Sequence, residues 1–257
     1  MTGQAASPRA VLDTPVPTGV HAVVFDCDGL LVDTEGCWTR AETALFRAHG
    51  HDFGQEQKAM VIGKSLADVG SVMADYFARP GDGAVLAAEL LDGVRRELAA
   101  GAQALPGALD LVRACAARVP VAVASNSPRV LLDVALSSSG LAGLFAVSFA
   151  ADEVAAAKPA PDLYLAACAA LGAEPSASVA FEDSGTGIAA ARAAGLHLVV
   201  VPSLPSQSLD HDWRTDSLAD PALQAWSLAL TDTRGAAGAD VPADAPADVR
   251  RSAGAAG

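Results

Sequence analysis

The sequence predicts an α/β fold, a doubly wound, Rossmann-like parallel sheet that carries an inserted helical cap domain. Short apolar runs alternate with helical patterns from about residue 103 onward, and such alternation is typical of parallel strands joined by right-handed crossovers. A long, purely helical stretch interrupts the alternation after the first apolar run. The 257 residues are enough for one large domain with an insertion of this size.

The first strand is predicted over His21–Asp26, because a continuous apolar run is typical of a parallel strand covered on both faces. Residues 33–102 show helical spacing only, in stretches that end at Gly50, at Pro80 and at Gly101. No strand pattern occurs in this range. We therefore expect residues 33–102 to form a helical cap domain.

Four further strands are expected, each preceded by a helical stretch, over residues 119–125, 144–149, 178–183 and 196–202. Together with the first strand, these four strands place residues 20–32 and 103–228 in the core domain. Residues 1–19, which hold three prolines, are expected to be a flexible arm. Residues 229–257 are rich in Ala, Gly, Asp and Pro, and we expect a disordered tail there.

The composition excludes several classes of partner. A net charge of −13 and a pI near 4.6 argue against binding to nucleic acid or to an anionic membrane. No stretch approaches the roughly 18 apolar residues that span a bilayer, and the N-terminus lacks the apolar segment of a signal peptide. The four cysteines form no C-x-x-C pair. We expect a cytoplasmic protein with reduced cysteines, and no pattern indicates its oligomeric state.

Polar side chains gather where the predicted strands end. They are Asp26, Asp28, Ser125, Asn126, Lys158, Glu182 and Asp183. In an open parallel sheet the carboxyl ends of the strands share one edge, and ligands bind there. Asp26 and Asp28 lie two residues apart and would repel each other. Carboxylates at this density need a cation, and an oxygen-only ligand set favours Mg²⁺. The metal and Lys158 would compensate the aspartates, and a bound phosphoryl group would complete the charge balance.

Four motifs occur in a fixed order: DCDGLLVDTE, VASNSPR, KPAPDLY and FEDSGTGIAAARAAG. They resemble the motifs of the haloacid dehalogenase superfamily over about residues 20–228. The resemblance is greatest to the branch with a helical cap after the first strand, which holds beta-phosphoglucomutases and small sugar-phosphate phosphatases. It implies that Asp26 is a nucleophile that forms an aspartyl-phosphate and that Asp28 is the general acid/base.

The same resemblance implies a phosphate site and a metal site. The phosphate-binding groups would be the Ser125 hydroxyl, the Asn126 backbone N–H and the Lys158 ammonium. The Mg²⁺ ligands would be Asp26, the Asp28 carbonyl oxygen and Asp183, with Glu182 as a further ligand or as a partner of the ligands. The expected partner is a small phosphorylated substrate.

Two alternatives to a phosphatase stay open. A phosphosugar mutase of this family uses a cap arginine in a G-x-S-R segment to hold a second phosphate. Here the matching segment GKSL has Leu66 at that position, and Trp38 stands where the mutases have a hinge histidine. Both departures favour a phosphatase that acts on a sugar or polyol phosphate. The second alternative is a non-catalytic binding protein on the same fold.

Other assignments fit the residues less well. GKS at 63–65 lacks the first glycine and the preceding strand of a P-loop. GTGIAA at 185–190 resembles a dinucleotide-binding turn, but no acidic residue ends the next strand to bind a ribose. A dehalogenase has no use for Asp28. The cap lysines Lys58 and Lys64 are only weak evidence for a phosphonate hydrolase.

Overall fold

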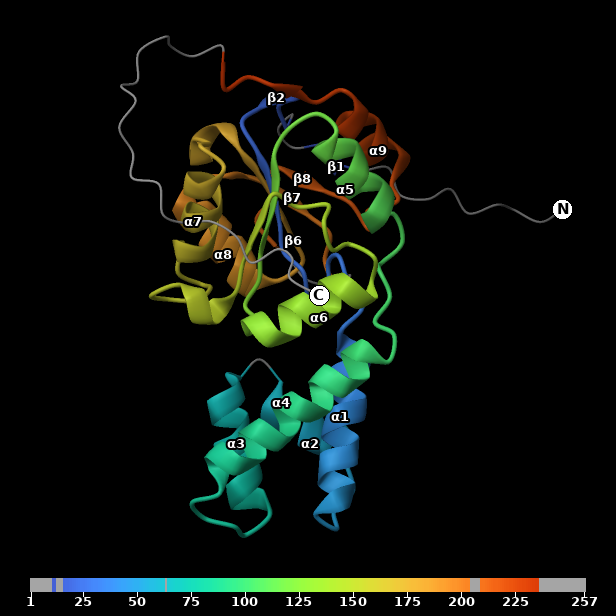
Figure 1. Ribbon diagram of the computed structural model, residues 1–257, viewed down its shortest axis with the longest axis vertical. Coiled ribbons are helices and arrows are strands. Elements are labelled where there is room, and N and C mark those ends of the chain that lie inside the picture. Colours follow the sequence, from blue (N-terminus) through green and yellow to red (C-terminus); the bar gives the residue numbers. More distant parts are fainter. Residues whose placement is uncertain (1–10, 13–15, 63, 204–208, 236–257) are drawn as a thin grey trace, which may run out of the picture.

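The structure, a computed structural model, describes residues 11–12, 16–62, 64–203 and 209–235. Its helices and strands form a core domain around a central sheet and a helical cap that extends from one end of that sheet (Figure 1). The predicted α/β fold with a doubly wound parallel sheet is therefore confirmed.

Within the described ranges, seven strands form the main sheet, in the order β1-β8-β7-β6-β3-β4-β5. They are β1 (Val11–Leu12), β3 (Val23–Phe25), β4 (Val121–Ala124), β5 (Val147–Phe149), β6 (Val179–Glu182), β7 (His197–Val200) and β8 (Trp213–Arg214). Neighbouring strands are parallel except for β1 beside β8. The strand β3 pairs with β4 on one side and β6 on the other, so that Val24 is level with Ala122 and with Ala180.

The five predicted strands correspond to β3 through β7, each shorter than the apolar run that indicated it. Four strands of two residues each were not predicted: β1, β8, β2 (Gly19–Val20) and β9 (Thr231–Asp232). Because β2 pairs with β9, and β1 with β8, segments expected to be a flexible arm and a disordered tail contribute to sheets. Strands this short leave no periodic pattern in a sequence. Residues 1–10, 13–15 and 236–257 of those segments lie outside the described residues.

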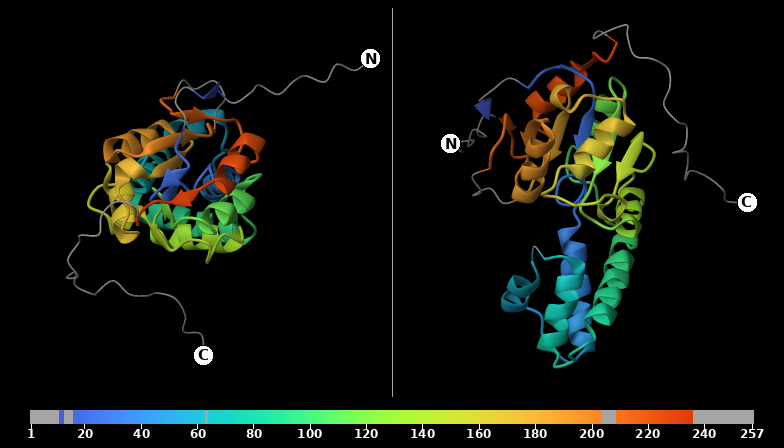
Figure 2. Two further views of the ribbon diagram at one scale, coloured as in Figure 1. Left: turned by 90° about the horizontal axis from the view of Figure 1, so that it is seen from above. Right: turned by 90° about the vertical axis from the view of Figure 1, so that its left-hand side faces the viewer.

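Helices cover both faces of the main sheet (Figure 1 and Figure 2). One face carries α7 (Asp162–Ala170) and α8 (Gly185–Ala194), and the other carries α5 (Ala108–Ala116), α6 (Arg129–Ser138) and α9 (Pro221–Leu228). Two 3-10 turns, Ala151–Glu153 and Pro175–Ala177, complete the core. Alternate residues of β3 point to opposite faces, so Val24 packs with α7 and α8, whereas Phe25 packs with the other helices.

Four helices form the cap: α1 (Glu35–Ala48), α2 (Gln55–Val61), α3 (Leu66–Tyr76) and α4 (Gly83–Ala99). The helix α4 packs against α1 and α3, and the interior holds an aromatic cluster in which Phe46 contacts Phe53 and Phe77. The three predicted helical stretches correspond to α1, α3 and α4. The helix α2 was not predicted, since its seven residues are too few for a clear period.

Two chain segments join the cap to the core side by side. Val32 forms an antiparallel bridge with Ala104. The backbone N–H of Asp33 donates to the Gln103 carbonyl oxygen at 2.9 Å. Beside this junction α4 also packs against α6.

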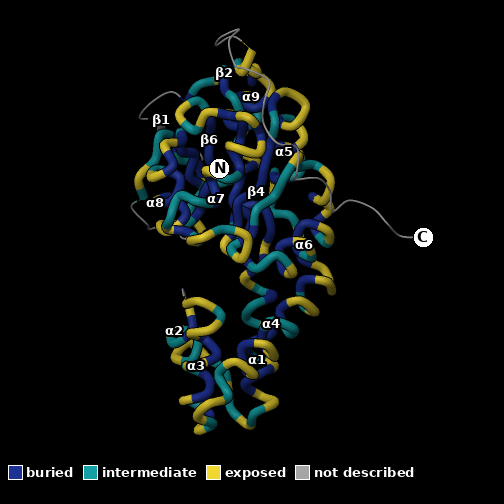
Figure 3. The backbone as a smooth tube through the Cα atoms, turned by 60° about the vertical axis from the view of Figure 1, so that its left-hand side comes forward, coloured by how far each residue is buried: buried dark blue, intermediate teal, exposed yellow. Residues whose placement is uncertain are grey.

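Figure 3 shows buried backbone inside the core sheet and largely exposed turns at the far end of the cap. Among the helices of the described ranges, none is long and apolar enough to cross a bilayer.

Candidate active site

The carboxyl ends of β3, β4 and β6 meet at the edge of the sheet that faces the cap (Figure 1). The chain leaves β3 for β4 and β5 on one side and later returns to β6 and β7 on the other, which makes this edge a topological switch point. A cavity of about 240 Å³ opens there. Its lining includes five of the seven predicted site residues: Asp26, Asp28, Asn126, Lys158 and Asp183. The other two, Ser125 and Glu182, are fully buried directly behind it.

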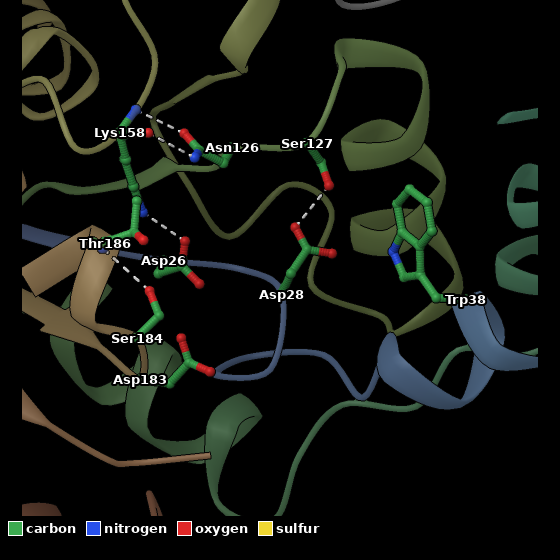
Figure 4. Close-up of a pocket in the computed structure, with 10 residues that line it drawn as sticks. Asp26, Asp28, Trp38, Asn126, Ser127, Lys158, Asp183, Ser184 and Thr186 are labelled. Carbon is green, nitrogen blue, oxygen red and sulfur yellow. Dashed lines mark hydrogen bonds and ion pairs between the residues drawn. The ribbon is translucent and has the colours of Figure 1, made fainter. Parts of the chain in front are cut away.

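Lys158 holds the Asp26 and Glu182 carboxylates together at the centre of the site, and Figure 4 shows the first of these two contacts. Its Nζ atom donates to Asp26 Oδ1 at 2.6 Å and to Glu182 Oε1 at 2.6 Å, and all three side chains are buried. A buried carboxylate without a positively charged partner is costly. Here the Lys158 ammonium is the partner of both Asp26 and Glu182, and Asp183 adds a third carboxylate beside them.

Burial and neighbouring charge shift the pKa values of these groups. Burial raises the pKa of Asp26 well above its ordinary value, although the Lys158 ammonium opposes this change. Burial alone would lower the pKa of Lys158, but the Asp26 and Glu182 carboxylates outweigh it and raise that pKa. Burial and the Glu182 carboxylate raise the pKa of Asp183 to about 7. A bound cation would therefore find a site whose negative charge is not fully compensated by protein groups.

Asp28 faces two serine hydroxyls from the loop after β4. Its Oδ2 atom accepts hydrogen bonds from Ser125 Oγ and from Ser127 Oγ, both at 2.9 Å. The loop itself is fixed, because the Ser127 backbone N–H donates to Ser125 Oγ at 3.0 Å. The two aspartates thus lie in different environments. Asp26 contacts a cation, whereas Asp28 contacts neutral hydroxyls.

The Asn126 side chain anchors the segment that carries Lys158. Its Oδ1 atom accepts from the Lys158 backbone N–H at 2.8 Å, and its Nδ2 atom donates to the Lys158 carbonyl oxygen at 3.1 Å (Figure 4). The sequence indicated only a backbone role for Asn126. The side chain adds a positioning role that joins two of the four motifs.

Three buried carboxylates form a set that could hold a metal ion. Asp26, Glu182 and Asp183 each offer an oxygen atom, and these atoms lie within 4.8 Å of one another. An all-oxygen set of this kind fits Mg²⁺. Glu182 is already well occupied, since its Oε2 atom accepts from the Asp183 backbone N–H at 3.2 Å and from Ser184 Oγ at 3.3 Å. Asp26 and Asp183 are the more available ligands.

Comparisons with known proteins identify the family of the chain. The sequence model of the haloacid dehalogenase-like hydrolases matches residues 20–195. The chain belongs to this family. Protein CbbY of Rhodobacter capsulatus is 37% identical over 220 residues, which cover 80% of this chain and 97% of that protein. The fructose-1-phosphate phosphatase YqaB of Escherichia coli is 31% identical over 179 residues, 70% of this chain and 95% of that protein.

Solved structures of the family share the fold. The crystal structure of CbbY from Rhodobacter sphaeroides in complex with phosphate matches with a TM-score of 0.67 at 26% identity, and the match covers 80% of this chain and 99% of that chain. A mutant of the same protein, in complex with xylulose-(1,5)bisphosphate, matches with a TM-score of 0.66 over 78% and 96% of the two chains at 26% identity.

Glycines bring the backbone of this hydrolase close to its carboxylates. Gly29 has φ +82°, and a Cβ atom there would lie 2.6 Å from Asp183 Oδ2. A Cβ atom at Gly187, in the first turn of α8, would collide with the Glu182 carboxylate. The glycine pattern that resembled a dinucleotide-binding turn is therefore explained by close packing of α8 on Glu182.

Several residues that contact the predicted site were not singled out from the sequence, and Ser127 and Tyr164 are two of them. Ser127, in the VASNSPR motif, bonds to Asp28. Tyr164, in the KPAPDLY motif, donates its hydroxyl to Glu182 Oε1 at 2.5 Å. A signal for Tyr164 did exist, because a buried tyrosine in an apolar helix needs a partner for its hydroxyl.

The cap of the hydrolase contributes the apolar side chain of Trp38 to the cavity, whereas Lys58 and Lys64 are not among the described residues that line it. Trp38, in the first turn of α1, lines the cavity (Figure 4). Lys58 Nζ donates to Glu42 Oε2 at 2.9 Å, and this ion pair joins α2 to α1 inside the cap. Lys64 is exposed, and Leu66 begins α3 partly buried.

Proposed function

We propose that this hydrolase is a Mg²⁺-dependent phosphatase that releases inorganic phosphate from a small sugar or polyol phosphate through an aspartyl-phosphate. One observation carries the proposal: the Asp26 carboxylate lies in a cavity with a lysine ammonium 2.6 Å from one oxygen and a second, hydroxyl-bound carboxylate beside it. These are the groups that phosphoryl transfer through an enzyme carboxylate requires. The names of two relatives, fructose-1-phosphate phosphatase YqaB and hexitol phosphatase B, support the substrate class.

In the first half-reaction, a carboxylate oxygen of Asp26 attacks phosphorus and the ester bond to the leaving oxygen breaks. Asp28 donates a proton to that oxygen. Since both serine hydroxyls bond to Asp28 Oδ2, proton transfer falls to Oδ1. Lys158 and the N–H groups of the loop after β4 stabilise charge on the phosphoryl oxygens.

In the second half-reaction, water attacks the aspartyl-phosphate and Asp28 takes up its proton. Free phosphate leaves and Asp26 is regenerated. Bound Mg²⁺ would neutralise phosphoryl charge and favour the ionised form of Asp26. Asp26, Asp183 and the Asp28 carbonyl oxygen would hold it, with Glu182 as a further ligand or behind them.

The cap favours hydrolysis over phosphosugar transfer. A mutase must clamp a second phosphate, for which a bidentate arginine is suited. Here Leu66 stands at the matching position, and the cap contributes Trp38 to the cavity. The nearby cation Lys58 is already paired with Glu42. A second phosphate would therefore meet leucine at position 66 and tryptophan at position 38, and neither side chain can bind it as an arginine would.

A phosphate-release screen with Mg²⁺ over phosphorylated sugars and polyols, with Asp26→Asn as the inactive control, tests the proposal. We expect phosphate release from monophosphates by the wild type only. A second arm supplies beta-glucose 1-phosphate with a trace of glucose 1,6-bisphosphate. Glucose 6-phosphate that accumulates faster than phosphate would indicate a mutase. No turnover of any compound would favour a binding protein.

A further inference from the structure

We propose that Tyr164 is a positioning residue that sets how the Lys158 ammonium is shared between Glu182 and Asp26. The inference deepens the proposed phosphatase function and rests on it. Tyr164 lies in α7, on the face of the sheet that α8 also covers, and it is not among the described residues that line the cavity. Its effect on the reaction would pass through Glu182 and Lys158.

The geometry places one carboxylate oxygen between two donors. Glu182 Oε1 accepts from Tyr164 Oη at 2.5 Å and from Lys158 Nζ at 2.6 Å. The Tyr164 ring also lies below the ammonium, with its centroid 4.9 Å from Nζ. All three side chains are buried, so these contacts act with little screening by water.

Glu182 cannot turn to change this arrangement. Its Oε2 atom accepts from the Asp183 backbone N–H at 3.2 Å and from Ser184 Oγ at 3.3 Å. The backbone of Gly187 closes the remaining side of the carboxylate. The negative charge on Oε1 is thus held at a fixed point, and its two donors compete for it.

The phenol hydroxyl consequently limits how strongly Glu182 attracts Lys158. Without the hydroxyl, Oε1 would serve Lys158 alone, and the ammonium would move toward Glu182 and away from Asp26 Oδ1. Asp26 is the residue that must meet the phosphoryl group. The ring and the hydroxyl have separable roles, because the ring supports the ammonium through its face whereas the hydroxyl acts on Glu182.

A purely structural tyrosine would not need this hydroxyl. The neighbours of Tyr164 in its cluster include Leu163, Ala167 and Cys168, which are apolar and buried, so a phenylalanine would fill the same space. Its hydroxyl is directed at the carboxylate that also binds the lysine.

The test is Tyr164→Phe, which keeps the ring and removes one oxygen atom. We expect kcat with a phosphate monoester to fall about tenfold, as for loss of a hydrogen bond to a charged group, while KM stays within about threefold. The matched control is Tyr76→Phe, the other tyrosine of the chain, whose hydroxyl accepts from Gln57 Nε2 in the cap. We expect it to change kcat less than about twofold.

A second readout needs no turnover. The chain holds three lysines, Lys58, Lys64 and Lys158, so protein with ¹⁵N-labelled lysine gives few side-chain ammonium signals. Lys58→Arg and Lys64→Arg assign the signal of Lys158 by elimination. We expect Tyr164→Phe to shift the Lys158 signal and change its exchange with water, while Tyr76→Phe leaves it in place.

The two readouts together separate the outcomes. A fall in kcat with an unmoved Lys158 signal would mean a structural role and overturn the proposal, as would an unchanged kcat. If the wild type releases no phosphate from any monoester, the proposed function fails. In that case the ammonium spectrum still shows whether Tyr164 governs Lys158.

Discussion

The Ser127 hydroxyl donates a 2.9 Å hydrogen bond to Asp28 Oδ2, the same oxygen that accepts from Ser125. Both hydroxyls bond to one oxygen, so that Asp28 Oδ1 has no partner among the described residues, and they fix the plane of the carboxyl group. A group that transfers a proton to a leaving oxygen needs such a fixed direction. The serine loop after β4 thus positions Asp28, in addition to the phosphate-binding role that we propose for it.

Ser127→Ala should lower kcat about tenfold with an alkyl phosphate, because Asp28 loses one of its two orienting hydrogen bonds. The loss should be smaller with p-nitrophenyl phosphate, whose leaving group needs little protonation. Steady-state kinetics with both substrates measure the difference. Ser138→Ala is the control, since Ser138 Oγ donates to the Val134 carbonyl oxygen of its own helix. An equal loss with both substrates would contradict a role in proton transfer.

Asp26→Asn and Asp28→Asn should fail at different steps. The first removes the nucleophile, so no aspartyl-phosphate should form with any substrate. The second keeps the nucleophile but loses proton transfer, a loss of about 10²- to 10⁴-fold in rate. Rapid-quench experiments with p-nitrophenyl phosphate should show a burst for Asp28→Asn only. A phosphoenzyme in Asp26→Asn would reject the assignment.

Affinity for Mg²⁺ should fall as the pH falls below 7. Burial and Glu182 raise the pKa of Asp183 to about 7 in the metal-free protein, so below that pH a proton must leave before the metal binds. One displaced proton makes the apparent affinity fall about tenfold per pH unit. Isothermal titration calorimetry at pH 6 and pH 8 measures it, and equal affinities would exclude Asp183 as a ligand.

Asp183→Asn should stabilise the metal-free protein at pH 8. A carboxyl with a higher pKa in the folded state favours folding at low pH, and this contribution is lost as the pH rises from its ordinary pKa of 3.8 to about 7. At pH 8 the ionised group therefore opposes folding, by a few kcal/mol at most. Thermal unfolding should show a higher Tm for the variant without metal and no increase on adding Mg²⁺. A lower Tm would show that the ionised group is compensated within the protein.

Gly29→Ala should weaken Mg²⁺ binding, and Gly50→Ala should not. Both glycines have positive φ, +82° and +81°, so both substitutions should cost roughly 1–2 kcal/mol of stability. Only at position 29 does the added Cβ meet Asp183 Oδ2; at position 50 nothing lies within 4 Å among the described residues. Chemical denaturation measures the shared strain and calorimetry the metal affinity. Equal metal affinities would mean that the loop yields without moving Asp183.

The fold and the location of the candidate site could be predicted because their signals are local. Each apolar run marks a strand, and the polar residue that follows it is carried to the common edge by the parallel topology. Seven residues chosen in this way lie in or directly behind one cavity. The pairings inside the cavity could not be predicted, since Ser127 and Asp28 are 99 residues apart and neither motif indicates the other. The strands β1 and β8 could not be predicted for the same reason, because their pairing depends on backbone contacts between segments that are distant in the sequence.

The position of β3 between β4 and β6 has a consequence during synthesis on the ribosome. Val23 emerges early, but its two partners, Val121 and Val179, follow only after the whole cap has been made. The cap helices contact their sequence neighbours and can fold while β3 still has two open edges. A nascent chain that stops between the end of α4 and Val179 therefore carries the cap helices and the two aspartates that follow β3, yet its candidate site is incomplete, because Glu182 and Asp183 have not been translated.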